Sequence, residues 1–269
     1  MKIVDRGSGA PVVLIPGIQG RWEWMRPAVD ALSRRCRVIT FSLADEPTAQ
    51  AGGIGSDLLD AYVQQVGDAM DQAGLDCAVI AGVSFGGRIA AAFASAYPDR
   101  TAGLVLVSAM PPGWVPDARV RFYVAAPRLL APLFCVQSLR LLDEFFTAAG
   151  SVPRGLLLAA RHGWTTFVHP MSPGRMARRA LAAAQRAGDR PVRAPGLPAL
   201  LVTGQADLDR VVPVRMTRQY LTYYPGARTV ELPRTGHLGL VTRPGVFADI
   251  LVPFVESAWH AASQRRHVV

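Results

Sequence analysis

Cysteine and long apolar runs are both scarce in this sequence, and each scarcity excludes a class of protein. Cys36, Cys77 and Cys135 are its only cysteines. They are odd in number, lie in apolar surroundings and lack metal-ligand spacing, so we expect reduced, buried thiols and neither a disulfide framework nor a metal centre. The longest apolar stretch, 120–136, is interrupted by arginines and prolines, which excludes a clean membrane span. The first seven residues lack the apolar segment of a secretory leader, so we expect a cytoplasmic protein.

Lysine is nearly absent as well. Lys2 is the only one, so arginine carries almost all the basic charge behind the formal net charge of +9. The arginines are scattered and no recognised nucleic-acid-binding module accompanies them, so we expect no nucleic-acid partner. One local group, Arg175, Arg178, Arg179 and Arg186, falls on a predicted helix. It could attract acidic substrates, although a solvated helix face is the simpler interpretation.

The most informative motif is the Gly-Val-Ser-Phe-Gly segment at 82–86. It follows an apolar, strand-like run at 77–81 and begins an Ala-rich helical run at 85–97. This is the context of a nucleophile elbow, where a sharp strand-to-helix turn holds the serine in a strained backbone conformation and the glycines let the two backbones approach. Ser84 is therefore the candidate nucleophile, at the carboxyl edge of the predicted sheet.

A serine nucleophile needs a base within hydrogen-bond reach and a carboxylate that orients the base. His237 follows a strand-like run at 229–232 and is the candidate base. Two carboxylates, Asp207 and Asp209, follow the strand-like run at 199–203, and only one can orient the histidine. Asp209 is favoured, but either gives the chain order serine, acid, histidine. The other carboxylate is expected to cap the following turn.

Backbone amides are the usual donors to the oxyanion of a tetrahedral intermediate. The N–H group of Phe85 lies next to the nucleophile at a helix start, where the helix dipole adds favourable potential. A Gly/Pro turn at 16–20 directly follows the strand-like run at 12–15, and the N–H group of Ile18 is its candidate donor. Phe85 and Ile18 are therefore the expected oxyanion hole.

Strand and helix patterns alternate along most of the chain. Strand-like runs recur at 12–15, 37–41, 77–81, 103–107, 199–203 and 229–232. A helical apolar spacing covers 57–72. Alternation of this kind predicts an α/β fold with a mostly parallel, doubly wound sheet covered on both faces.

The alternation breaks between about 110 and 198, where helical segments replace strands. We therefore expect a core of 1–109 and 198–269 and a helical lid insertion over 110–197. Most large apolar side chains of the lid are expected to form its own core and its contact with the sheet, a minority lining the substrate pocket: Trp114, Phe122, Tyr123, Leu129, Leu130, Phe134, Phe145, Phe146, Trp164 and Phe167. An apolar lid of this kind could also support a homodimer.

These motifs resemble those of α/β-hydrolase fold proteins of the serine esterase type, over nearly the whole chain. The resemblance rests on the turn around Gly17, the elbow at 82–87, the segment 209–213 and the Gly-His pair at 236–237. Two departures stand out: Pro16 occupies a position where family members often have His, and the acid loop is two residues longer.

The resemblance implies the triad Ser84, Asp209 and His237 with the amides of Ile18 and Phe85, and neither cofactor nor metal. The expected activity is cleavage of small-molecule carboxylic esters of small to medium apolar acids, through an acyl-enzyme on Ser84. Thioesterase, lactonase, carbon–carbon bond hydrolase and perhydrolase activities fit the same triad. Haloalkane dehalogenases and epoxide hydrolases of this fold have aspartate at the elbow, so Ser84 argues against both. A ligand-binding receptor that retains the fold is the non-enzymatic alternative.

Overall fold

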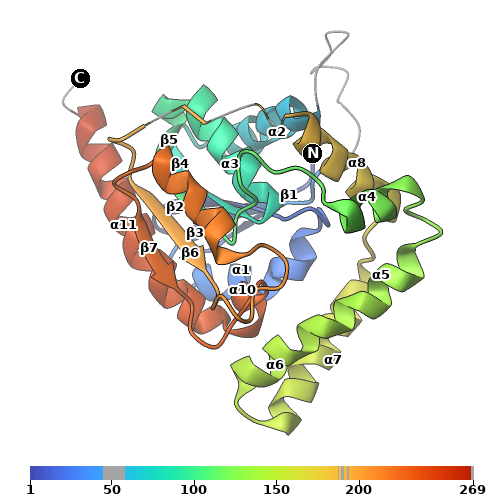
Figure 1. Cartoon of the computed structure of the whole chain (residues 1–269). Helices are drawn as coiled ribbons and strands as arrows, with labels where there is room; N and C mark the ends of the chain where they lie inside the picture. Colours follow the sequence, from blue (N-terminus) through green and yellow to red (C-terminus); the bar gives the residue numbers. More distant parts are fainter. Residues whose placement is uncertain (45–57, 187, 189–190, 193, 268–269) are drawn as a thin grey trace.

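The computed structural model in Figure 1 describes residues 1–44, 58–186, 188, 191–192 and 194–267. Within them, seven strands form one sheet in the order β1-β3-β2-β4-β5-β6-β7. β1 is antiparallel to β3, and the other pairs are parallel. The strands are β1 (Ile3–Arg6), β2 (Pro11–Ile15), β3 (Arg37–Phe41), β4 (Ala78–Val83), β5 (Thr101–Val107), β6 (Ala199–Thr203) and β7 (Arg228–Glu231).

The expected α/β architecture with a mostly parallel sheet is confirmed. Central strands β2, β4 and β5 are buried along their whole length, which explains their continuous apolar sequences. The structure adds β1, which the sequence did not predict. This four-residue edge strand has only two apolar residues, and none of its residues is fully buried, so its apolar signal is weak.

Helices cover both faces of the sheet, in two apolar layers. On one face α1 (Arg26–Leu32) and α11 (Pro244–His267) pack against the strands, and on the other α2 (Leu58–Gln72) and α3 (Phe85–Ala96) do so (Figure 1). Asp57, the first residue of the helix expected at 57–72, lies outside the described residues. Short elements complete the core: α9 (Val214–Thr217), α10 (Gly239–Thr242), and the 3-10 helices η1 (Trp22–Met25), η2 (Pro98–Arg100) and η4 (Arg218–Thr222).

A helical insertion separates β5 from β6, at the place where the lid was expected. We use "the insertion" for its elements, which are α4 (Ala118–Ala125), α5 (Ala131–Ser138), η3 (Leu139–Leu141), α6 (Leu142–Ala149), α7 (Val152–Val168) and α8 (Pro173–Gln185). In Figure 1 it runs from green to yellow, with α6 and α7 extending away from the sheet and α8 beside α2. Four residues of the expected lid, 187, 189, 190 and 193, lie outside the described part of the chain.

The expectation that most large apolar side chains of the lid are packed holds for six of the ten, since Phe145 is buried and five others are half-buried, namely Trp114, Tyr123, Leu130, Phe134 and Phe146. The other four are exposed, with exposed fractions of 52% for Phe122, 80% for Leu129, 67% for Trp164 and 76% for Phe167. Trp164 and Phe167 are exposed because their helix, α7, packs along only one narrow strip. Gly155 is its only buried residue, and a Cβ atom there would collide with the ring of Phe146.

The expectation of three buried thiols is also partly wrong. Cys36 and Cys77 are buried in the apolar layer between the sheet and the helices α1 and α11. Cys135 is exposed on α5, which has no buried residue. Among the described residues, no helix is long and apolar enough to cross a membrane.

Candidate functional site

Ser84 occupies the turn between β4 and α3 and has a left-handed backbone, with φ 54° and ψ −115°. Its N–H group donates to the Val107 carbonyl over 2.9 Å, and its own carbonyl accepts from the N–H groups of Gly87 and Met110, each over 3.0 Å. A non-glycine residue in this region is strained, and such strain persists only where neighbouring contacts impose it. These three hydrogen bonds impose the conformation expected of a nucleophile elbow.

The glycines around Ser84 are required by close backbone contacts. A Cβ atom at Gly82 would lie much closer to the Gly86 carbonyl oxygen than van der Waals contact allows. One at Gly86 would lie 2.5 Å from the carbonyl oxygens of both Ile15 and Pro16. The start of α3 is therefore pressed against the turn that follows β2.

That approach places the two expected oxyanion donors on neighbouring segments. Phe85 is the first residue of α3, and Ile18 lies in the turn closed by the hydrogen bond from Gly20 N–H to Gly17 carbonyl, 2.9 Å long. In the described part of the chain, neither the Phe85 nor the Ile18 N–H group has an acceptor. Amides at a helix start lack partners within the helix, so the Phe85 amide is available to an anion.

Arg179 supports the turn that contains Ile18. This buried side chain of α8 donates to the Ile18 carbonyl over 2.8 Å, to the Tyr62 hydroxyl over 3.0 Å and to the Leu43 carbonyl over 3.3 Å. The sequence interpretation, which placed Arg179 with a solvated face, is wrong for this residue. One sequence signal could have predicted the burial of Arg179. At helical spacing it shares a face with the apolar residues Ala180 and Ala183, which are buried.

His237 and Asp209 lie together in the loops after β7 and β6. The Nδ1 atom of His237 is 3.3 Å from Oδ1 and 3.4 Å from Oδ2 of Asp209, whose side chain is completely enclosed. Asp209 Oδ1 also accepts from the N–H groups of Val211 and Val212, over 3.1 and 2.9 Å. One carboxylate thus both faces the histidine and caps the turn.

Asp207, the alternative acid, is exposed, and its carboxylate has no hydrogen bond or ion pair to any described residue. The expectation that the second carboxylate caps the turn is therefore wrong. The reason is the direction of the loop, which turns Asp209 inward and Asp207 toward solvent.

Burial and charge act in opposite directions on this pair. Burial alone would raise the pKa of Asp209, but His237 and the amides of Val212 and Val211 bring the pKa below its ordinary value. Burial alone would lower the pKa of His237, but Asp209, and then Glu144, raise that pKa above its ordinary value. The site therefore favours a carboxylate facing an imidazolium.

Ser84, Asp209 and His237 follow β4, β6 and β7, whose parallel carboxyl ends meet at one edge of the sheet. The structure pairs His237 with Asp209. It shows no hydrogen bond between the Ser84 side chain and His237 among the described residues. Asp209 and His237 are thus in contact, whereas Ser84 is at the same sheet edge without a bond to the imidazole.

Glu144, which the sequence did not single out, is the second acid near His237. It belongs to α6 of the insertion and is 2% exposed. Its Oε1 and Oε2 atoms lie 2.9 and 3.0 Å from the Leu238 nitrogen, and the Thr242 hydroxyl lies 3.5 Å from Oε1. Burial raises the pKa of Glu144, an effect that hydrogen bonds from the amides of Leu238 and Gly236 partly offset.

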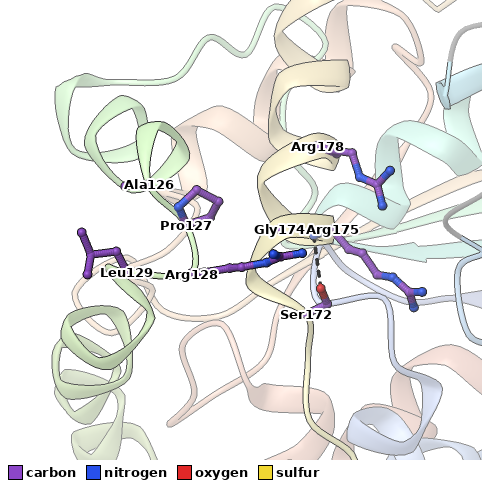
Figure 2. A pocket seen from close by; sticks show the side chains of 8 residues that line it. All are labelled: Ala126, Pro127, Arg128, Leu129, Ser172, Gly174, Arg175 and Arg178. Atoms are coloured by element: carbon purple, nitrogen blue, oxygen red, sulfur yellow. Dashed lines mark hydrogen bonds between the residues drawn. The ribbon is translucent and has the colours of Figure 1, made fainter.

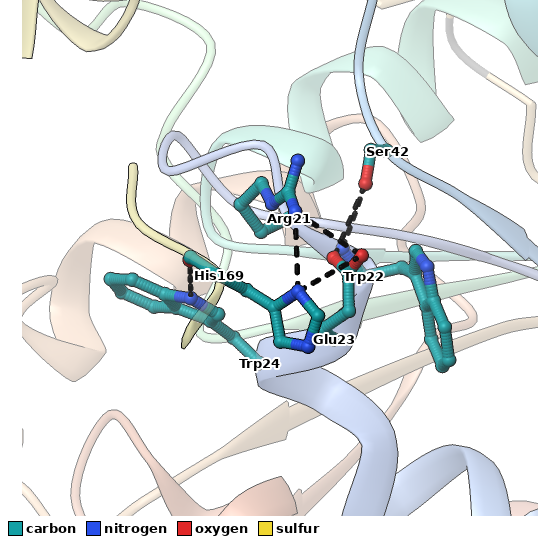
Figure 3. Close-up of polar contacts among 6 residues, drawn as sticks. All are labelled: Arg21, Trp22, Glu23, Trp24, Ser42 and His169. Carbon is teal, nitrogen blue, oxygen red and sulfur yellow. Dashed lines mark hydrogen bonds and ion pairs between the residues drawn. The ribbon is translucent and has the colours of Figure 1, made fainter. Parts of the chain in front are cut away.

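The insertion also contacts the core beside the turn after β2 (Figure 3). The carboxylate of Glu23 lies 3.3 Å from Arg21 Nη2 and 3.7 Å from His169 Nδ1. Trp24 Nε1 donates to the His169 carbonyl over 2.9 Å. The residue at the end of α7 is thus held to η1 by polar contacts.

An open cavity of about 730 Å³ lies where the α4–α5 connection faces the start of α8 (Figure 2). It is lined by Ala126, Pro127, Arg128, Leu129, Ser172, Gly174, Arg175 and Arg178. None of the candidate triad or oxyanion residues lines it. Within the described residues, no group of three or more His, Cys, Asp or Glu side chains could hold a metal ion.

A mostly parallel sheet with a serine elbow and a histidine–aspartate pair at its carboxyl edge defines the class of α/β hydrolases. The family model described as "Alpha/beta hydrolase family" matches residues 12–250. The chain belongs to this family of hydrolases.

Two curated relatives bear the name "Putative carbamate hydrolase RutD". The Caulobacter segnis protein is 26% identical over 275 residues, which cover 93% of each chain. The Azorhizobium caulinodans protein is 32% identical over 109 residues, and the match spans 40% of this chain and only 39% of that protein.

Solved structures share the fold over almost the whole chain. The esterase EaEST from Exiguobacterium antarcticum has a TM-score of 0.73 at 18% identity, over 94% of each chain. A structure described as "Est816 as an N-Acyl homoserine lactone degrading enzyme" has a TM-score of 0.71 at 20% identity, over 94% of this chain and 96% of that one.

Replacing Arg179 with Met is expected to lower the free energy of unfolding by about 2 to 4 kcal/mol, because the change leaves the carbonyls of Ile18 and Leu43 and the Tyr62 hydroxyl without this donor. Urea unfolding monitored by circular dichroism measures the change. Arg178→Met removes the same type of side chain from an exposed neighbouring position of α8 and should change the value by less than about 0.5 kcal/mol. Equal effects of the two substitutions would contradict the assigned role.

Proposed function

We propose that the protein is a serine hydrolase that cleaves carboxylic esters of small to medium apolar acids. The observation that carries the proposal is the buried Asp209–His237 pair at the sheet edge where Ser84 occupies a strained elbow. The amides of Phe85 and Ile18, without acceptors in the described part of the chain, support it further.

In the proposed first half-reaction, Ser84 Oγ attacks the ester carbonyl and His237 accepts the hydroxyl proton. Because Nδ1 of His237 faces Asp209, the proton goes to Nε2. The N–H groups of Phe85 and Ile18 donate to the oxyanion of the tetrahedral intermediate. Its collapse breaks the bond to the alkoxy oxygen, which takes the proton from His237 and leaves as the alcohol.

In the second half-reaction, water attacks the acyl-enzyme while His237 takes one of its protons. The second tetrahedral intermediate uses the same two amides. Its collapse returns the proton to Ser84 Oγ and releases the carboxylic acid. Both steps require His237 to approach the Ser84 hydroxyl, and this approach is part of the proposal.

The ester substrate is supported by the Exiguobacterium antarcticum esterase, which shares the fold. The alternatives on the same triad are thioesterase, lactonase, carbon–carbon bond hydrolase and perhydrolase activities. Lactone cleavage has support from Est816, a protein of the same fold that is described as degrading N-acyl homoserine lactones. A binding protein that retains the fold is the remaining alternative, and serine-directed labelling separates it from all the enzymes.

We also propose that the insertion supports a homodimer. Its exposed apolar side chains include Leu156 and Leu157 of α7, with exposed fractions of 57% and 59%, besides Trp164 and Phe167. The rings of Trp164 and Phe167 lie 5.8 Å apart, so part of this exposed apolar surface is contiguous, which is typical of an interaction site.

The first test is hydrolysis of p-nitrophenyl esters from acetate to decanoate, by the wild-type protein and by Ser84→Ala. The wild-type protein should turn over the shorter esters, and Ser84→Ala should lose at least about 10³-fold in kcat because no nucleophile remains. Labelling with a fluorophosphonate should show the same dependence on Ser84. Labelling without turnover of any ester would move the proposal to a more specialised substrate, and absence of both would favour a binding protein.

The two aspartates of the acid loop provide a matched pair of variants. Asp209→Asn should lower kcat by about 10²- to 10⁴-fold, because the histidine loses the carboxylate that orients and charges it. Asp207→Asn makes the same chemical change on an exposed side chain and should leave kcat within about twofold. The reverse ranking would assign the orienting role to Asp207.

Light scattering coupled to size-exclusion chromatography tests the oligomeric state. The wild-type mass should approach twice the 28.9 kDa of the chain, and Leu156→Gln combined with Phe167→Gln should return it to the monomer, because polar side chains weaken an apolar interface. A monomeric wild-type protein at high concentration would refute the dimer. Leu181→Gln, at an exposed position of α8, is the control substitution outside α7.

A further inference from the structure

Glu144 is a buried carboxylate whose hydrogen bonds lead from its own helix to the segment around His237. Its side chain leaves α6 and reaches the segment that carries His237. There it accepts from the Leu238 N–H group with both oxygens, at 2.9 and 3.0 Å, and lies 3.5 Å from the Thr242 hydroxyl. The Gly236 amide also acts on this carboxyl and lowers its pKa. The residues immediately before and after His237 therefore both interact with one carboxylate of the insertion.

The space around Gly236 shows how close this contact is. A Cβ atom at that position would lie 2.9 Å from Glu144 Oε2, and it would also collide with the Leu208 carbonyl of the acid loop. The histidine loop is thus enclosed between the acid loop and α6. Asp143, the neighbouring residue of α6, forms an ion pair of 3.0 Å with Arg210, but both side chains are exposed, and a solvated pair of this kind contributes little to holding the helix.

A buried carboxylate is costly unless hydrogen bonds and charge compensate it. The Leu238 amide compensates Glu144, and the Thr242 hydroxyl, which it shares with the Leu238 carbonyl, adds a longer contact. The negative charges of Asp209 in the acid loop and of Glu144 in α6 both favour the charged form of the His237 imidazole. Two carboxylates from two separate segments therefore act on one imidazole.

We propose that Glu144 is a positioning residue of the reaction, which orients the loop of His237 through its backbone amides and places a second negative charge beside the imidazole. The insertion thereby helps to set the position and basicity of the histidine. The effect on rate rests on the proposed hydrolase activity, whereas the effect on the histidine itself does not.

The sign of the pH effect follows from the charge. A negative Glu144 stabilises the imidazolium, so neutral His237, the form that acts as a base, appears only at higher pH than it would beside Asp209 alone. Glu144→Gln keeps the length of the side chain and one acceptor oxygen but removes the charge. In this variant the imidazole should become neutral, and the enzyme active, at lower pH than in the wild type.

The test compares four proteins: wild type, Glu144→Gln, Glu144→Asp and the matched control Asp143→Asn, which removes an equal charge from the neighbouring, exposed position of α6. NMR titration of the histidine ring, with the signal of His237 assigned by its loss in His237→Gln, measures the imidazole without any substrate. The pH profile of p-nitrophenyl ester hydrolysis measures the reaction. Circular dichroism establishes that each variant is folded.

In Glu144→Gln, the NMR midpoint and the acid limb of the rate profile should both move to lower pH. The rate at about pH 5.5, relative to its plateau, should rise by about three- to tenfold. In Glu144→Asp the midpoint should stay near that of the wild type, because the charge remains, while kcat falls by about tenfold or more, since the shorter side chain displaces the loop. Asp143→Asn should leave both readings near those of the wild type.

An unchanged midpoint in folded Glu144→Gln would overturn the proposal, and so would an equal shift in Asp143→Asn. If Glu144→Gln does not fold, the Glu144→Asp variant decides, because an unchanged kcat there would refute positioning. Absence of hydrolysis by the wild type together with a shifted NMR midpoint would refute the proposed function alone.

Discussion

The close approach of two backbones at the elbow is the constraint on which the rest of the site depends. β4 must end and α3 must begin within one strained residue, and glycines on both sides of Ser84 are the only residues without a colliding Cβ atom. The same approach presses the start of α3 against the turn after β2, and these two segments carry the Phe85 and Ile18 amides. A single packing requirement therefore presents the serine and aligns its expected oxyanion donors.

The insertion contributes two buried charged side chains, one at the turn of Ile18 and one at the loop of His237. Each has the hydrogen-bonding groups, donor or acceptor, that its partners there require. Arg179, a donor only, binds the Ile18 carbonyl, and the N–H group of Ile18, which belongs to the preceding peptide bond, has no acceptor in the described part of the chain. Glu144, an acceptor, binds the Leu238 amide directly after His237. Arg88, one turn after Ser84, donates to the carbonyls of Ala183 and Arg186 and ties α3 to α8.

Local patterns predicted those parts of the molecule that depend on neighbours along the chain. Buried strands appear as continuous apolar runs, and the elbow as glycines around a serine between a strand and a helix. The loops that carry the acid and the histidine were predicted for the same reason, because each follows a strand-like run. The sequence did not show which way the acid loop turns, and this direction separates Asp209 from Asp207. Arg179 and Glu144 escaped detection because their partners lie 161 and 94 residues away, and helical periodicity reports which face is buried but not which polar group it meets.

The exposed positions of the insertion show that an apolar sequence can also predict burial where the structure has none. Aromatic and aliphatic side chains predict burial, yet α7 exposes Trp164 and Phe167 because a neighbouring segment covers only one strip of this helix. Beside apolar residues such as Ala183, two buried charged residues, Arg179 and Glu144, join the insertion to the core, and both hold loops of the candidate site. Substitutions that alter the exposed apolar surface of α7 can therefore leave the candidate site intact, whereas substitutions that shift α6 or α8 must change the loops that hold His237 and Ile18.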